Sequence, residues 1–309
     1  MQPPPIPHGV AVVSAPAVVD TVLLAVAVMA TSTSAPLIAA TAAPTLAIAF
    51  WRNAFAGGLL VPWALGRRWD ELRRLDRREW RLSITSGALL AAHFGTWIPS
   101  LALTSVASST ALVSTQAVWA AIFARAAGHR VPRGVWIGAS VAVVGAALVA
   151  GVDVSVSTRA LAGDLLALAG AAMAAGYVTV GGAVRSGAER EGTVREKVST
   201  VSYTAICYSI CAVVLLVVDL ASGQRLVGWD AATWLKLLAL TAGAQLLGHS
   251  LVNVALRSAS ATVVSLVMLL EVPGAAIIAA LWLHQVPGWA AVPGLALLLG
   301  GAALVLRAR

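Results

Sequence analysis

Residues 82–124 read LSITSGALLAAHFGTWIPSLALTSVASSTALVSTQAVWAAIFA, and this stretch decides the fold. It contains no acidic or basic side chain, although it is twice as long as the roughly 20 apolar residues that span a bilayer as one helix. The stretch therefore predicts two membrane helices joined by a tight turn. Residues 272–306 are equally free of charge and predict a second hairpin of the same kind.

The composition of the whole chain agrees with these two hairpins. Of the 309 residues, 59% are hydrophobic and 11% are charged, whereas roughly a quarter of the residues in a soluble domain are charged. A water-soluble fold is therefore excluded. The 21 Lys and Arg exceed the 13 Asp and Glu and give a net charge of +8. In a soluble protein this excess would suggest a nucleic-acid partner, but in a membrane protein it marks the cytoplasmic loops.

Apolar runs bounded by charges, Gly and Pro predict an all-α integral membrane protein with ten transmembrane helices. Their predicted ranges are 19–40, 45–66, 82–103, 107–126, 134–152, 162–183, 199–218, 237–256, 261–283 and 288–306. Residues 1–18 carry several prolines but neither Lys nor Arg, and we expect a disordered cytoplasmic tail there. Residues 307–309 are predicted to form the cytoplasmic C-terminus.

The positions of the basic residues set the orientation of these helices. Seventeen of the 21 fall in connections on the side of the two termini, three (Arg159, Arg225 and Lys236) fall on the opposite side, and Arg52 lies inside a helix. Positive residues stay in the cytoplasm, so a multi-pass protein of the cell membrane with both termini cytoplasmic is predicted, with no nucleic-acid partner. The arginine-rich connection after residue 66 is either a solvated orientation signal or a contact with anionic lipid.

The chain contains an internal repeat. Residues 131–149 resemble residues 286–305, and Gly87 to His93 resemble Gly243 to His249. We therefore expect a first repeat over residues 19–152 and a second over residues 153–306. Five helices per repeat is an odd number, so the second copy must be inverted in the membrane, which places a substrate site near the midplane between the halves.

Three motifs give the chain a specific resemblance. They are PTLAIAFWR at residues 44–52, GDLLALAG at residues 163–170 and LEVP at residues 270–273. With them the chain resembles the drug/metabolite transporter superfamily, as a member with two EamA-type repeats over about residues 19–306. The resemblance implies two inverted five-helix halves around a central cavity, and export of amino acids, other metabolites or drugs.

Two charged side chains fall at predicted membrane depth, where charges are costly and usually meet a cavity or a partner. Glu271, two residues before Pro273, can bind a solute amine or exchange a proton, and Pro273 is expected to bend the helix there. Alternatively, Glu271 bonds to a neighbouring helix and fixes its packing. Arg52 can hold a solute carboxylate through two N–H groups. Alternatively, it extends toward the membrane surface or neutralises Glu271.

Further candidate substrate-binding residues are polar or aromatic. His93 and His249 occupy matching places in the two repeats, and helical spacing puts Trp97 on the face of His93 and Asn253 on the face of His249. A solute contact or proton relay is one interpretation, and hydrogen-bonded packing is the other. Gln116, Trp119 and Tyr177 add surface of the same kind. Trp51, Trp97 and Trp119 also depart from the aromatic belts expected at the membrane faces, so we expect them at a cavity.

Other function classes are disfavoured by what is missing from these motifs. No carboxylate or cysteine completes a metal site around the histidines. Cys207 and Cys211 lie four residues apart, which fits neither a CxxC redox pair, a metal pair nor a disulfide within a helix, so we interpret both as small packing residues. No GxxxxGK[ST] loop indicates ATP-driven transport, and no cofactor is expected. We therefore predict a secondary exporter of small solutes that works by alternating access, with the solute and membrane lipids as partners. An intramembrane enzyme and a non-transporting scaffold or sensor are the alternatives.

Overall fold

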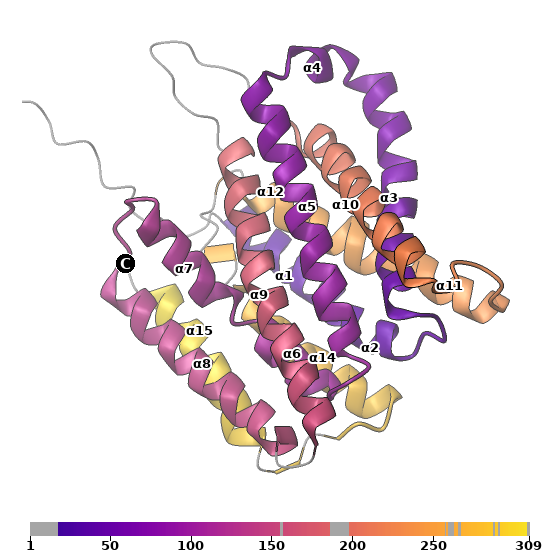
Figure 1. Ribbon diagram of the computed structural model, residues 1–309. Helices are drawn as coiled ribbons and strands as arrows, with labels where there is room; N and C mark the ends of the chain where they lie inside the picture. The colour runs from indigo at the N-terminus through magenta and orange to yellow at the C-terminus, as the bar shows by residue number, and fades with distance from the viewer. Residues whose placement is uncertain are drawn as a thin grey trace, which may run out of the picture.

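The computed structural model describes residues 18–154, 157–185, 198–256, 258, 263–264, 267–286, 288–289 and 291–307. Within these ranges all regular structure is helical. Figure 1 shows the long helices packed side by side as one bundle. The predicted tail apart from Val18, residues 186–197 and residues 308–309 lie outside the described residues.

The helices follow the predicted apolar runs in order. They are α1 (Val18–Ser32), α2 (Ser34–Ala39), α3 (Thr45–Arg67), α4 (Trp69–Arg74), α5 (Arg77–Ser100), α6 (Val106–Val113), α7 (Gln116–Ala126), α8 (Arg133–Val154), α9 (Thr158–Arg185), α10 (Thr200–Ser222), α11 (Ala231–Leu240), the π-helix η1 (Thr241–His249), α12 (Ser250–Ala255), the 3-10 helix η2 (Met268–Leu270), α14 (Glu271–Trp282) and α15 (Ala291–Arg307). Among the described residues, five helical stretches are long and apolar enough to cross a membrane: 21–39, 106–126, 158–184, 200–222 and 231–255. The count of ten spans stays a prediction.

Several stretches that we expected as regular helices are interrupted near their middle. Residues 19–40 divide into α1 and α2, and residues 107–126 divide into α6 and α7. Hydroxyl groups at these breaks bond to carbonyls one turn earlier, as Thr33 Oγ1 does to Ala30 O at 2.7 Å and Ser114 Oγ to Thr110 O at 2.7 Å. Such bonds compete with the regular helical pattern and bend it.

Two helices begin five or six residues earlier than predicted, and α9 begins four residues earlier, at Thr158. The helix expected from residue 82 begins at Arg77, where Asp76 and Glu79 form a reciprocal capping box. The helix expected from residue 237 begins at Ala231, because Asp230 Oδ1 accepts a hydrogen bond from Thr233 N at 2.9 Å. A capping side chain satisfies the free N–H groups of a first turn, and this outweighs the nearby charges.

Lys236 therefore lies inside α11 and not in the connection where we expected it. Its Nζ donates to Ala40 O at 2.7 Å, the C-cap residue of α2. A cation at the negative end of a helix dipole is favourable, so the lysine joins two elements at this face of the bundle.

Small residues allow the closest helix packing. α8 and α15 lie side by side in Figure 1. A Cβ atom on Gly145 would lie 2.6 Å from Gly294 O, and one on Gly294 would lie 2.7 Å from Gly145 O. A Cβ atom on Gly301 would lie 2.5 Å from Gly138 O. Glycine therefore lets the two helix backbones come nearly into contact at this interface.

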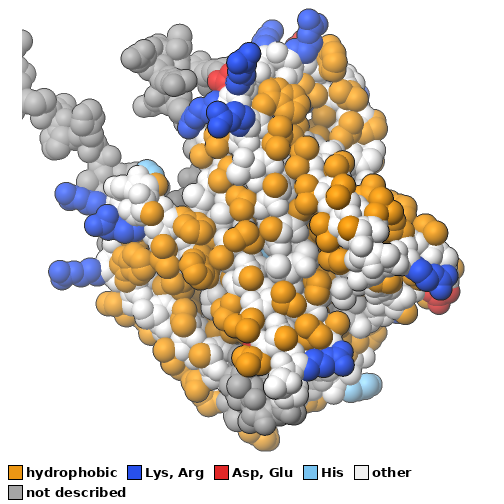
Figure 2. Space-filling model, in the orientation of Figure 1, with side chains coloured by type: hydrophobic (Ala, Val, Ile, Leu, Met, Phe, Trp, Pro, Cys, Tyr) orange, Lys and Arg blue, Asp and Glu red, His pale blue; other side chains and the backbone are white. Residues whose placement is uncertain are grey.

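The surface divides into apolar sides and a basic end. In Figure 2 hydrophobic side chains cover the flanks of the helices, and most visible Lys and Arg gather at the end that carries α4 and beside the α7–α8 turn. The apolar flanks include Leu281, which is 78% exposed, and Val217, which is 62% exposed. Such a surface fits lipid and not water. Cys207 and Cys211 are both buried, as expected of packing residues.

Candidate functional site

A central cavity gathers most of the predicted site residues. His93, Trp97, Gln116, Tyr177, His249 and Glu271 all line it, and Ser34, Ser114 and several apolar side chains complete the wall. These residues come from α2, α5, α7, α9, η1 and α14, so helices from both repeats contribute. The breaks in the helices meet here too, because Ser34 follows the α1–α2 break and Ser114 belongs to the α6–α7 break.

The cavity is small in this conformation. Its volume is about 50 Å³, enough for a few water molecules but below the roughly 300 Å³ at which ligand pockets begin. A solute the size of an amino acid fits only after the surrounding helices move apart.

Glu271 is the acidic side chain of this cavity. It opens α14 directly after the 3-10 turn η2, and its carboxyl group interacts with the Thr31 hydroxyl. Pro273 therefore lies in the first turn of α14, where the missing N–H of a proline costs nothing, and η2 interrupts the regular α-helix just before it. Gly274, one residue further, leaves room for Ser32 Oγ to approach closely.

Arg52 reaches the cavity wall without lining it. The side chain is 0% exposed. Its Nε donates to Gln245 Oε1 at 2.9 Å, its Nη1 donates to Ser34 Oγ at 3.3 Å, and its Cζ lies 4.2 Å from the centre of the Phe94 ring. Its Nη2 has no hydrogen-bond partner among the described residues. The guanidinium group is thus held in place and keeps one donor available.

Gln245 is a site residue that the sequence analysis missed. Its Nε2 donates to Asn53 Oδ1 at 3.0 Å, and Asn53 Nδ2 donates to Ala49 O at 2.9 Å. Gln245, Asn53 and Arg52 are all fully buried. They form a polar chain that joins η1 to α3. In the sequence, Gln245 lies four residues before His249, just as Asn253 lies four residues after it. This helical spacing places Gln245 on the same helix face as His249.

The two histidines differ in their surroundings. His93 Nδ1 lies 3.0 Å from Gly170 O. Since a carbonyl only accepts, Nδ1 carries the hydrogen and Nε2 of a neutral ring is left as an acceptor. The His93 ring stacks on Trp97 with centroids 5.6 Å apart, whereas His249 meets the edge of Phe94 at 5.6 Å. Packing therefore fixes both rings while they line the cavity.

Other polar atoms at the site lack partners within the part of the chain that the structure describes. Asn253 Nδ2 donates to Tyr177 Oη at 2.8 Å, but Asn253 Oδ1 is unpaired, and so is Trp97 Nε1. A buried polar atom without a partner costs about 1–3 kcal/mol. A bound solute or water that supplied the missing partners would recover this free energy.

Two of the expected tryptophans lie elsewhere. Trp119 is 36% exposed on α7 and pairs with Phe123 at a ring distance of 6.3 Å, outside the cavity lining. Trp51 donates to Leu226 O at 2.7 Å and meets Trp234 edge-on at 5.1 Å. Trp51 therefore lies outside the lining of the central cavity and packs against the connection between α10 and α11.

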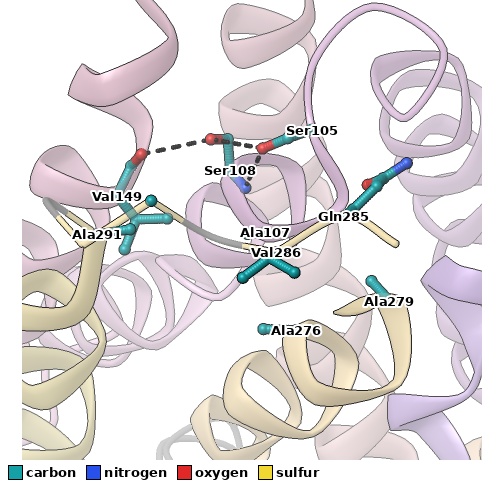
Figure 3. Close-up of a pocket in the computed structure, with 10 residues that line it drawn as sticks. Ser105, Ala107, Ser108, Val149, Ala276, Ala279, Gln285, Val286 and Ala291 are labelled. Atoms are coloured by element: carbon teal, nitrogen blue, oxygen red, sulfur yellow. Dashed lines mark hydrogen bonds between the residues drawn. The ribbon is translucent and has the colours of Figure 1, made fainter. Parts of the chain in front are cut away.

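A larger cavity lies at the ends of α6, α8 and α14 (Figure 3). Its volume is about 300 Å³. In Figure 3, dashed lines join Ser105, Ser108 and Val149, and Gln285 Oε1 accepts from Val106 N at 3.4 Å. Acidic and basic side chains are absent from the described residues that line it. We therefore take the central cavity, which has Glu271 and unpaired polar atoms, as the candidate site.

Comparison with known proteins agrees with this architecture. The sequence profile of the EamA-like transporter family matches residues 19–151 and 161–307. The chain belongs to the EamA-like transporter family. A solved crystal structure shares its fold, with a TM-score of 0.70 at 17% identity over 93% of this chain and 96% of that chain. No protein with a curated description matches the sequence. This EamA-like chain is therefore a multi-pass membrane protein of a transporter family, as its motifs predicted.

Proposed function

We propose that this EamA-like protein is a secondary active exporter that moves small amino-acid-like or amphipathic solutes across the cell membrane. The observation that carries the proposal is the convergence of Glu271, two histidines and the unpaired Trp97 Nε1 on one cavity where helices of both repeats are broken. In membrane transporters, broken helices at the midplane are where substrates bind.

The proposed mechanism is alternating access between two inverted five-helix halves, with both termini in the cytoplasm. Support comes from the pairing of corresponding helices, since α3 packs on α10, α6 on α14 and α8 on α15. Each pair joins one helix from either repeat, as a twofold relation between the halves requires. Rocking of one half against the other would enlarge the small central cavity toward one membrane face at a time.

Solute recognition is assigned to side chains with complementary hydrogen-bonding roles. Glu271 would accept from a solute amine, and the Trp97 indole would donate to a solute oxygen. Arg52 does not line the cavity itself, but it donates a hydrogen bond to the hydroxyl group of Ser34, which does. Through this contact Arg52 would place a positive charge near a solute carboxylate. The aromatic rings of His93, Trp97 and Tyr177 cover the apolar part of the solute.

Proton coupling through Glu271 follows from the cost of charge at this depth, a few kcal/mol for an ionised group. Glu271 would carry a proton when no cation is near and release it when a solute amine or Arg52 compensates the carboxylate. Glu271→Gln keeps the size and hydrogen-bonding capacity of the side chain but cannot exchange a proton.

The experiment uses purified protein in proteoliposomes with an imposed pH gradient. Its solute is chosen beforehand by a thermal-shift screen of amino acids, nucleosides, polyamines and cationic drugs, because a ligand that binds the folded state stabilises it. We expect Glu271→Gln to lose the response of flux to the gradient, while Asp70→Asn on exposed α4 keeps it. An unchanged pH response in Glu271→Gln would reject proton coupling, and no flux of any solute would reject transport itself.

A further inference from the structure

The end of the molecule that carries α4 presents a dense group of basic and aromatic side chains. Seven exposed arginines lie on the last turn of α3, between α3 and α4, on α4 and on the first turns of α5: Arg67, Arg68, Arg73, Arg74, Arg77, Arg78 and Arg81. Three tryptophans accompany them, with Trp63 59% exposed, Trp69 52% and Trp80 38%. Figure 2 shows blue side chains gathered at this end. We call these ten residues the arginine–tryptophan face.

Backbone groups occupy most of the acidic side chains of this segment. Asp76 and Glu79 form the capping box of α5. Glu71 Oε1 accepts from Ser199 N at 2.6 Å and anchors α4 to the start of α10. Of the four acidic residues between positions 67 and 81, only Asp70 has no such role. Seven arginines against four carboxylates leave this segment with a net positive charge, and three of the four carboxylates also accept from backbone N–H groups.

The second repeat provides an internal comparison. Asp76-Arg-Arg-Glu-Trp80 corresponds to Asp230-Ala-Ala-Thr-Trp234, and both aspartates cap a helix. The second copy thus forms the same cap with alanines in place of Arg77 and Arg78. Its tryptophan packs against Trp51 and Trp229, whereas Trp80 is exposed. Neither the arginines nor the exposure of the indole is needed to build this helix start.

We propose that the arginine–tryptophan face binds the headgroups of anionic phospholipids in the adjoining membrane leaflet. One guanidinium group can bind two phosphate oxygens at the same time. Basic segments next to a membrane-spanning helix are attracted to anionic lipid. Indoles favour the headgroup level, where the ring is buried and the N–H stays wet. A free phosphate would satisfy the arginines only, so the exposed indoles favour a lipid.

The test compares the full-length protein in nanodiscs of phosphatidylcholine with and without phosphatidylglycerol. We expect phosphatidylglycerol to raise the unfolding temperature on the order of 2–4 °C, and native mass spectrometry to retain it in preference to phosphatidylcholine. The variant Arg73→Gln/Arg78→Gln/Arg81→Gln should lose at least half of the temperature gain and the preferential retention. Trp69→Ala should weaken retention without changing the net charge.

A matched control removes three exposed arginines elsewhere on the same predicted side, Arg125→Gln/Arg130→Gln/Arg133→Gln. It should keep the temperature gain and the retention. Equal losses in both triple variants would overturn the proposal and leave only diffuse attraction between charges. An equal stabilisation by soluble glycerol phosphate in phosphatidylcholine nanodiscs would also overturn it, because a free anion would then be sufficient. None of these results depends on the transported solute.

Discussion

Arg52 shows how one charged residue is held inside an apolar bundle. A buried guanidinium group is costly, and acceptors for its N–H groups reduce this cost. Gln245 supplies the acceptor at 2.9 Å, and the Phe94 ring faces the positive charge at 4.2 Å. Asn53 in turn fixes the Gln245 amide. Gln245, Asn53 and Phe94 together therefore hold Arg52 beside the cavity.

Replacing Gln245 tests this dependence. Gln245→Leu keeps the approximate volume but removes the acceptor of Arg52 Nε and the donor to Asn53. Because a buried charged donor is left unpaired, we expect the free energy of unfolding to fall by about 3 kcal/mol. Reversible denaturation of the purified protein in detergent measures it. Gln245→Glu restores an acceptor and should recover much of the loss, whereas a Gln245→Leu protein as stable as the wild type would contradict the role given to this residue.

At the scale of elements, the N-caps of α5 and α11 determine where those helices begin. Asp76 and Asp230 each accept a hydrogen bond from the backbone N–H three residues later. Each cap therefore makes the segment that follows it helical, although that segment carries charged side chains. The cap of α11 also draws Lys236 into the helix, from which it reaches the end of α2. Local capping chemistry in this way sets contacts between distant elements.

The cap of α11 predicts a pH dependence. Hydrogen bonds from the side chain and backbone of Thr233 lower the pKa of Asp230 below its usual 3.8. Because the pKa of Asp230 is lower in the folded state than in the unfolded state, the ionised cap stabilises the protein at any pH above the unfolded-state pKa. This contribution is lost as the pH falls through the pKa that Asp230 has in the folded state. Asp230→Asn still offers a capping oxygen but does not titrate there.

We therefore expect the wild-type protein to lose more of its unfolding temperature than Asp230→Asn between pH 6 and about pH 3, since the ordinary aspartate range lies near pH 4. Thermal unfolding of both proteins at the two pH values makes the comparison, and it cancels the titration of all other groups. Equal losses in the two proteins would show that the Asp230 cap contributes no pH dependence.

At the scale of the whole molecule, the two repeats meet through corresponding helices. The glycine contacts between α8 and α15 are reciprocal, because Gly145 approaches Gly294 O and Gly294 approaches Gly145 O. Such close approach allows two backbones to pack without intervening side chains. At the centre of the molecule the helices are broken instead, and the cavity forms there.

The glycine interface gives a test of this packing. A methyl group at Gly145 has no room before the carbonyl of Gly294, so Gly145→Ala must separate the helices and should lower the free energy of unfolding by about 1–3 kcal/mol. Gly300→Ala in α15 is the control, since no atom lies within 4 Å of its Cβ position and alanine favours a helix over glycine by about 0.5–1 kcal/mol. Thermal unfolding should rank Gly300→Ala above the wild type and Gly145→Ala below it.

The sequence by itself determined the helical membrane fold, the family and most of the cavity residues. These follow from local properties: apolar length, helical spacing and a repeat that puts His93 and His249 in matching places. Only the tertiary structure decided which side chains meet. It joined Arg52 to Gln245, moved Trp119 and Trp51 away from the cavity, and broke helices that read as continuous. The physical reason is that partners such as Arg52 and Gln245, 193 positions apart, are selected by packing and hydrogen bonding across helices, which no local pattern records.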